Sequence, residues 1–210
     1  MHGFGDLIEG YHRFRNQRYA SEKQRWADLA AGQSPRAIII ACCDSRADPA
    51  TIFDTDPGEI FVVRNVANLV PPFEAGGGRH GVSAALEFAV IQLGVPEVMV
   101  MGHERCGGIQ AALTGQFADA KAGEGGFIAN WMDQIAGPAA TIAHDHGTGP
   151  DAALALEEAA IRLSLANLRT FPFVASREAA GDLAVVGCHF SISEGQLYLL
   201  DESAGTFNPL

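Results

Sequence analysis

The sequence is poor in basic residues, and this shortage argues against partners that need a positive protein surface. Lysine and arginine together number 14, against 25 aspartate and glutamate residues, in a chain of 210 residues with a formal net charge of −11 at pH 7. Nucleic acids and anionic membrane surfaces attract proteins through a basic footprint. We therefore expect neither nucleic acid nor a membrane among the partners of this chain.

Long apolar runs and a secretory leader are missing as well. No apolar run approaches the roughly 20 residues that a helix needs to cross a bilayer. Residues 1–6 (MHGFGD) do not begin a basic segment followed by an apolar one. Only four cysteines occur. Without a secretory signal we expect a reducing compartment, the cytoplasm, where cysteines are more often metal ligands than disulfide partners.

Length and composition favour a single α/β domain. A chain of 210 residues with 48% hydrophobic content can bury one sizeable core. No internal repeat or linker divides it, so we expect residues 1–210 to form one domain. Apolar side chains in residues 1–32 recur with partial helical spacing, and several arginines lie between them. This spacing predicts an N-terminal helical arm, either a solvated amphipathic helix or a segment that packs on a partner subunit.

Short apolar runs predict a mostly parallel central β-sheet flanked by helices. Residues 37–41 contain three isoleucines, which is typical of a buried parallel strand. Helices are expected over residues 82–93 and over most of 107–167, and residues 76–78 (Gly-Gly-Gly) predict a flexible connection. Further strands are expected at residues 60–63, 98–101, 183–186 and 196–200.

Two segments that follow predicted strands carry the chemistry. Residues 42–46 read Cys-Cys-Asp-Ser-Arg, and residues 102–108 read Gly-His-Glu-Arg-Cys-Gly-Gly. The spacing of His103 and Cys106 puts both side chains within reach of one ion, and Cys42 comes from another strand end. Thiolate and imidazole suit zinc. Three protein ligands leave a fourth position open, which is typical of a catalytic site rather than a structural one.

Asp44 and Arg46 add a carboxylate and a guanidinium to the first of these segments. An isolated pair of this kind on a protein surface contributes little to stability. Beside a metal, the guanidinium can hold the carboxylate by a bidentate contact. The carboxylate can then accept a proton from the nucleophile or ligate the metal itself.

Both segments resemble the signatures of the β-class carbonic anhydrases. Residues 87–90 (Glu-Phe-Ala-Val), 98–100 (Val-Met-Val) and 102–107 match the second signature of that family. The first signature differs at two positions, because Cys43 stands where the family has serine and Ala47 where it has a bulkier residue. The resemblance runs from about residue 33 to residue 108 and is weaker as far as residue 200.

The resemblance implies a role for each residue of the two segments. Cys42, His103 and Cys106 would be the ligands of one zinc ion per chain, and Asp44 with Arg46 the catalytic dyad. Asp44 could also take the fourth metal position in an inactive state.

The resemblance also implies a substrate pocket that is shared between subunits. Its wall would include Gln33, Phe61 and Phe88, partly supplied by a neighbouring copy of the chain. The expected assembly is a homodimer or a homotetramer.

The implied activity is that of a lyase, carbonate dehydratase, which hydrates carbon dioxide reversibly to bicarbonate and a proton. Two alternatives stay open. A hydrolase of carbonyl sulfide or carbon disulfide could use the same fold and metal. A non-catalytic zinc-binding protein could use the metal alone, but it would need neither Asp44 nor Arg46.

Two further groups of residues could bind a metal. His144, Asp145 and His146 could chelate an ion, but we expect them in a polar loop without one. Cys188 and His189 are expected at a strand end, in the core, with local hydrogen bonding.

Overall fold

A computed structural model describes residues 3–76 and 78–210. The chain divides into two compact units, Met1–Ser34 and Pro35–Leu210. The expected 76–78 connection includes residue 77, which lies outside the described residues. In the described part of the chain, no helix is long and apolar enough to span a membrane.

The N-terminal unit is helical, as the sequence predicts, and its described residues form three helices. They are α1 (Phe4–Asn16), α2 (Arg18–Ser21) and α3 (Lys23–Ala31). Within these described helices no residue is buried. One face of α1 exposes the large apolar side chains Phe4, Leu7, Ile8 and Tyr11.

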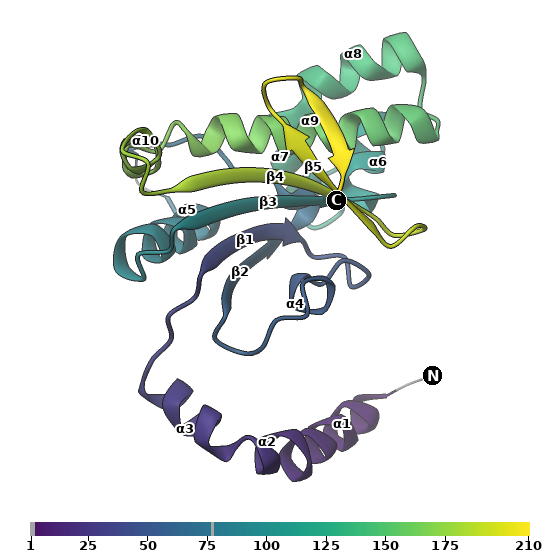
Figure 1. The fold of residues 1–210 in the computed structure, drawn as a ribbon. Helices are drawn as coiled ribbons and strands as arrows, with labels where there is room; N and C mark the ends of the chain where they lie inside the picture. Colours follow the sequence, from purple (N-terminus) through teal and green to yellow (C-terminus); the bar gives the residue numbers. More distant parts are fainter. Residues whose placement is uncertain (1–2, 77) are drawn as a thin grey trace. The chain divides into compact units, whose positions relative to one another are not determined.

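The second unit is built on a six-stranded sheet of order β2-β1-β3-β4-β5-β6 (Figure 1). The first four strands in that order are parallel, and the last two pair antiparallel at one edge. This confirms the mostly parallel sheet; the short edge strand β6 was not expected. The strands are β1 (Ala37–Cys42), β2 (Ile60–Asn65), β3 (Glu97–His103), β4 (Ala184–Ser191), β5 (Gln196–Asp201) and β6 (Thr206–Pro209).

Helices flank this sheet, and α9 (Pro150–Leu168) contacts both β3 and β4. Figure 1 shows α8 (Ala136–His146) running alongside α9, on the far side from the strands. The predicted helix over residues 82–93 is instead α5 (Gly81–Glu87) followed by a π-helix, η2 (Phe88–Gln92). The other helices are α4 (Pro49–Ile52), η1 (Val66–Asn68), α6 (Gly107–Thr114), α7 (Gly126–Met132), η3 (Asp133–Ile135) and α10 (Pro172–Ala179).

Strand β1 is buried on both faces, which explains its run of isoleucines. Ile38 and Ile40 belong to one core cluster, and Ile39 and Ala41 belong to another. Successive side chains of a strand point to opposite faces, so an uninterrupted apolar run fits a strand covered on both sides. Cys42 ends this strand and belongs to a third cluster, which includes residues of α6 and α9.

Candidate metal centre

Two neighbouring parallel strands bring the cysteine and histidine side chains together. Cys42 is the last residue of β1 and His103 is the last residue of β3. A turn then leads to Cys106, the N-cap residue of α6. The three potential ligand atoms all lie within 4.8 Å of one another, and all three residues are buried. The sulfurs of Cys42 and Cys106 are 3.8 Å apart, too far for a disulfide of about 2.05 Å.

The imidazole of His103 is oriented as a metal ligand. Its Nδ1 lies 2.9 Å from the carbonyl oxygen of Glu104, which can only accept, so Nδ1 carries the proton. Nε2 is left with a lone pair, and it is buried without a hydrogen-bond partner among the described residues. An unpartnered buried nitrogen is costly unless a further group satisfies it. The donor set and this orphaned atom therefore fit a zinc ion, because metal-bound histidines usually donate their other N–H in this way.

The two thiols share one proton, and only Cys42 is poised to lose its own. The hydrogen bond from Cys106 lowers the pKa of the Cys42 thiol to about 4, so Cys42 is the thiolate of the pair. The same contact raises the pKa of Cys106, and burial raises it further. Thiolate is the form that binds metals, and a divalent cation would displace the remaining shared proton.

Asp44 lies beside this group and is fixed by Arg46. The guanidinium donates from Nε to Oδ1 over 2.9 Å and from Nη2 to Oδ2 over 2.7 Å. The backbone N–H of Arg46 also donates to Oδ1, and Nη2 reaches the carbonyl oxygen of Arg105 at 3.1 Å. These contacts hold the pKa of Asp44 well below its ordinary value. The free side of the carboxylate faces the metal group, with Oδ2 4.0 Å from His103 Nε2.

Two supporting residues were not assigned a role from the sequence. Arg64, on β2, donates to the carbonyl oxygens of Cys42 and Asp44 and so braces the segment between them. Glu157, on α9, accepts the backbone N–H of Cys106 at 3.0 Å. The pairing of β1 with β2 could have indicated Arg64, because it places Arg64 opposite Ala41, next to Cys42. No local sequence pattern indicates Glu157, which lies 51 residues from Cys106.

Two of the expected pocket residues, Phe61 and Phe88, do not belong to the metal group of their own chain. Phe61 and Phe88 contact each other, with ring centroids 6.0 Å apart, and Phe88 is exposed. Phe61 pairs with Ile38, four residues before Cys42, which is about 13 Å along the strand. Gln33 belongs to the N-terminal unit.

The remaining candidates stand apart from the metal group. Cys43 is exposed. His144 and His146 lie at the C-terminal end of helix α8 and are exposed, so the expectation of a loop is wrong. His189 lies within β4 and is buried, which confirms the expected core position, and its Nε2 lies 3.0 Å from a carboxylate oxygen of Glu157, 32 residues away in the sequence.

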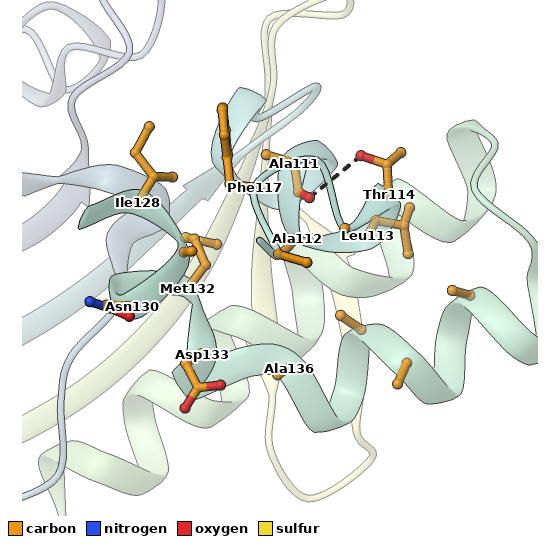
Figure 2. Close-up of a pocket in the computed structure, with 16 residues that line it drawn as sticks. Ala111, Ala112, Leu113, Thr114, Phe117, Ile128, Asn130, Met132, Asp133 and Ala136 are labelled. Atoms are coloured by element: carbon orange, nitrogen blue, oxygen red, sulfur yellow. Dashed lines mark hydrogen bonds between the residues drawn. The ribbon is translucent and has the colours of Figure 1, made fainter. Parts of the chain in front are cut away.

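An apolar cavity of about 590 Å³ lies elsewhere in the same unit. Figure 2 shows its lining from α6, α7 and α8, with Phe117 at one side and Met132 and Ile128 nearby. Alanine side chains form much of the rest of the wall. None of the residues expected at the active site lines this cavity, so it is not the metal centre.

Comparison with known proteins gives a consistent result. The family model described as carbonic anhydrase matches residues 37–197. A carbonic anhydrase of Pseudomonas aeruginosa is 36% identical over 203 residues, covering 96% of this chain and 90% of that protein. A carbonic anhydrase of Synechocystis sp. is 32% identical, covering 93% and 70%. The structure of the β-carbonic anhydrase CcaA superposes with a TM-score of 0.89 at 29% identity, covering 99% of each chain.

Proposed function

The chain belongs to the β class of the carbonic anhydrases, and we propose that Cys42, His103 and Cys106 hold its zinc ion while Asp44 and Arg46 act in catalysis. The enzyme is a lyase that hydrates carbon dioxide reversibly to bicarbonate and a proton. One observation carries the residue assignment. Nε2 of His103 is buried and has no hydrogen-bond partner among the described residues. It lies within 4.8 Å of the sulfurs of Cys42 and Cys106, and the carboxylate of Asp44 lies beside it.

The protein side chains divide the work between them. When bound, zinc supplies the Lewis acidity that lowers the pKa of water and so provides a nucleophile near neutral pH. Asp44 accepts a hydrogen bond from that nucleophile and directs its lone pair toward the carbon of carbon dioxide. Arg46 donates a hydrogen bond to each carboxylate oxygen of Asp44, which keeps the carboxylate ionised and prevents it from rotating.

The contact between Asp44 and Arg46 also bears on the resting state of the site. If Arg46 released the carboxylate, Asp44 could take the fourth metal position and exclude water. The bidentate contact present here supports the arrangement in which that position is open to substrate. We therefore assign this conformation to the active form.

We further propose that the active enzyme is a homodimer or a homotetramer. Phe61 and Phe88 lie far from the metal group of their own chain, so they would line the pocket of a neighbouring copy. The exposed apolar face of α1 offers a surface for such an assembly. A pair of β-carbonic anhydrases of Sordaria macrospora, to one of which this chain is 25% identical, is described as tetrameric. Sedimentation should give at least twice the chain mass of 22.2 kDa, and an active monomer would contradict the shared pocket.

A reducing compartment, the cytoplasm, fits these ligands. Cys42 and Cys106 must stay reduced to bind zinc, and their sulfurs are already 3.8 Å apart. Fractionation of the source cells tests this assignment directly, and recovery outside the cytoplasmic fraction would contradict it.

The test of the activity is a pair of assays on the zinc-loaded chain. Carbon dioxide hydration is followed by proton release in a stopped-flow instrument, and carbonyl sulfide hydrolysis by sulfide release. We expect fast proton release that disappears when zinc is removed and returns when it is restored. Sulfide release without carbon dioxide hydration would overturn the substrate assignment.

A further inference from the structure

A buried carboxylate connects the metal group to the neighbouring strand β4. Glu157, on α9, is only 3% exposed. Its Oε1 accepts the backbone N–H of Cys106 at 3.0 Å, and its Oε2 lies 3.0 Å from Nε2 of His189, on β4. His189 is 4% exposed. A buried carboxylate is tolerated only when its oxygens are satisfied, and here each oxygen has its own partner.

The backbone at Cys106 needs such a hold. Strand β3 ends at His103 and α6 begins at Gly107, so the N–H of Cys106 is bonded within neither element, although its carbonyl accepts the N–H of Gln110 in α6. Arg105 just before it has φ +54°, a left-handed conformation that is unfavourable for a residue with a side chain. A turn of this kind keeps its geometry only when surrounding contacts fix it. Glu157 supplies that contact from a different helix.

Two glycines let α9 come close enough to do so. A Cβ at Gly102 would lie 2.7 Å from Ile161 Cδ1, and a Cβ at Gly187 would lie 2.8 Å from Ile161 Cγ2. Ile161 is one helical turn after Glu157, on the same face of α9. Because Gly102 and Gly187 have no side chains, α9 packs close to β3 and β4 at Ile161. This close packing brings Glu157 within hydrogen-bonding distance of Cys106.

We propose that Glu157 is a positioning residue for the metal centre. It holds the backbone N–H of Cys106 and thereby fixes where the Cys106 sulfur lies, and His189 holds the second oxygen of Glu157 so that the carboxylate cannot rotate. Glu157 touches neither substrate nor metal. The inference rests on the proposed zinc site, because it concerns the placement of one ligand of that site.

The experiment compares three variants of the full chain. Glu157→Met keeps similar length but has no acceptor for the Cys106 N–H. Glu157→Gln keeps one acceptor oxygen. Leu168→Ala, on the same helix, removes a buried side chain from a core cluster that contains no proposed ligand, and serves as the control for general destabilisation. Zinc affinity is measured by competition with a chromogenic chelator, and the ligand geometry by the visible absorption of the cobalt(II)-substituted protein.

We expect Glu157→Met to weaken zinc binding about 10- to 100-fold, the range seen when a residue behind a metal ligand is removed. The cobalt bands should shift as well. Glu157→Gln should recover most of the affinity, because its amide oxygen can still accept the Cys106 N–H. Leu168→Ala should lower the thermal midpoint but leave the zinc affinity and the cobalt spectrum unchanged.

The outcomes separate this inference from the proposed function. Failure of the unaltered chain to bind zinc would overturn the proposed site itself. Zinc binding by the unaltered chain, with the same affinity and spectrum in Glu157→Met, would overturn only the positioning role. If Glu157→Met does not fold, Glu157→Asp decides by the same measurements. That side chain is one methylene shorter, so weaker zinc binding supports the proposal and unchanged binding contradicts it.

Discussion

Two cysteine–histidine pairs lie at the ends of neighbouring strands, yet only one of them is built for a metal. His103 is the last residue of β3 and Cys106 follows that strand, whereas Cys188 and His189 lie in β4, where His189 pairs with Gly102. All four residues are buried. Nε2 of His103 has no hydrogen-bond partner in the part of the chain that the structure describes, whereas Nε2 of His189 is bonded to Glu157. The two pairs therefore have the same residue types and the same burial. They differ in that Nε2 of His103 has no hydrogen-bond partner among the described residues, and this marks His103 as a ligand.

The cysteines of the two regions differ in the same way. The sulfur of Cys42 receives a hydrogen bond from Cys106, which lowers its pKa to about 4. Cys188 belongs to an apolar cluster, and burial alone raises its pKa to about 12. A second thiol at 3.8 Å thus turns one buried cysteine into a thiolate, while its absence leaves the other a small apolar side chain.

Removing a ligand should have the largest effect. Cys106→Ser should lose zinc and carbon dioxide hydration together, because a hydroxyl does not replace a thiolate on this metal. We expect activity to fall by more than the roughly 100-fold limit typical of residues behind the ligands. Zinc content and stopped-flow rate are measured on the same sample. Cys43→Ser, the same change at the exposed neighbour of Cys42, is the control and should alter neither zinc content nor rate. Full zinc content with normal activity in Cys106→Ser would contradict the proposed metal site.

Changing the carboxylate beside the metal should come next. Asp44→Asn should keep zinc but lower kcat about 100-fold or more, because an amide can present a hydrogen to the nucleophile where a carboxylate can only accept one. Asp48→Asn is the matched control. Asp48 is also held by an arginine, with Oδ2 2.7 Å from Arg64 Nη1, but it is not part of the metal group. Equal losses in the two variants would indicate that Asp44 acts only on the structure.

The pH profile should show a smaller, graded effect. Two thiolates compensate the charge of zinc, so water should be acidified less than at a three-histidine site, where its pKa is about 7. We therefore expect kcat to rise with pH, with an apparent pKa at or above neutrality.

Asp44 should not shape this profile. Arg46 holds its pKa well below the ordinary value of about 3.9, so the stability from this pair is present above that value and is lost only as pH falls through the lower pKa of the folded state. The measurement is kcat from acidic to alkaline pH, with zinc content checked at both ends. A rate that falls as pH rises while zinc stays bound would contradict the mechanism.

The second cysteine region should give the smallest response. Cys188→Ala should keep zinc and activity, and it should reduce the free energy of unfolding by about 1 kcal/mol, as expected for one deleted heavy atom in a packed core. Denaturant unfolding and zinc content measure the two effects. Loss of zinc in this variant would contradict the view that only Cys42 and Cys106, and not Cys188 in β4, belong to the metal site.

The sequence predicts much of this arrangement because its strongest signals are local. The apolar runs before Cys42 and before His103 both predict buried strands. Because parallel strands end at the same edge of a sheet, the two residues are expected to lie close together. The interaction of Glu157 with Cys106 joins residues 51 positions apart and depends on the depth of α9 over two glycines, which no spacing rule encodes. The edge strand β6 is short and half-polar, so its pairing with β5 decides its conformation more than its composition does.

The central claim is that the metal lies between β1 and β3 and not at the other histidines. An anomalous difference map collected at the zinc absorption edge, on crystals of the zinc-loaded protein, locates the ion directly. We predict one peak per chain, bonded to Cys42 Sγ, His103 Nε2 and Cys106 Sγ, at about 2.3 Å from each sulfur and about 2.0 Å from the nitrogen. A peak at His144 and His146 instead, or none between the two strand ends, would contradict this account.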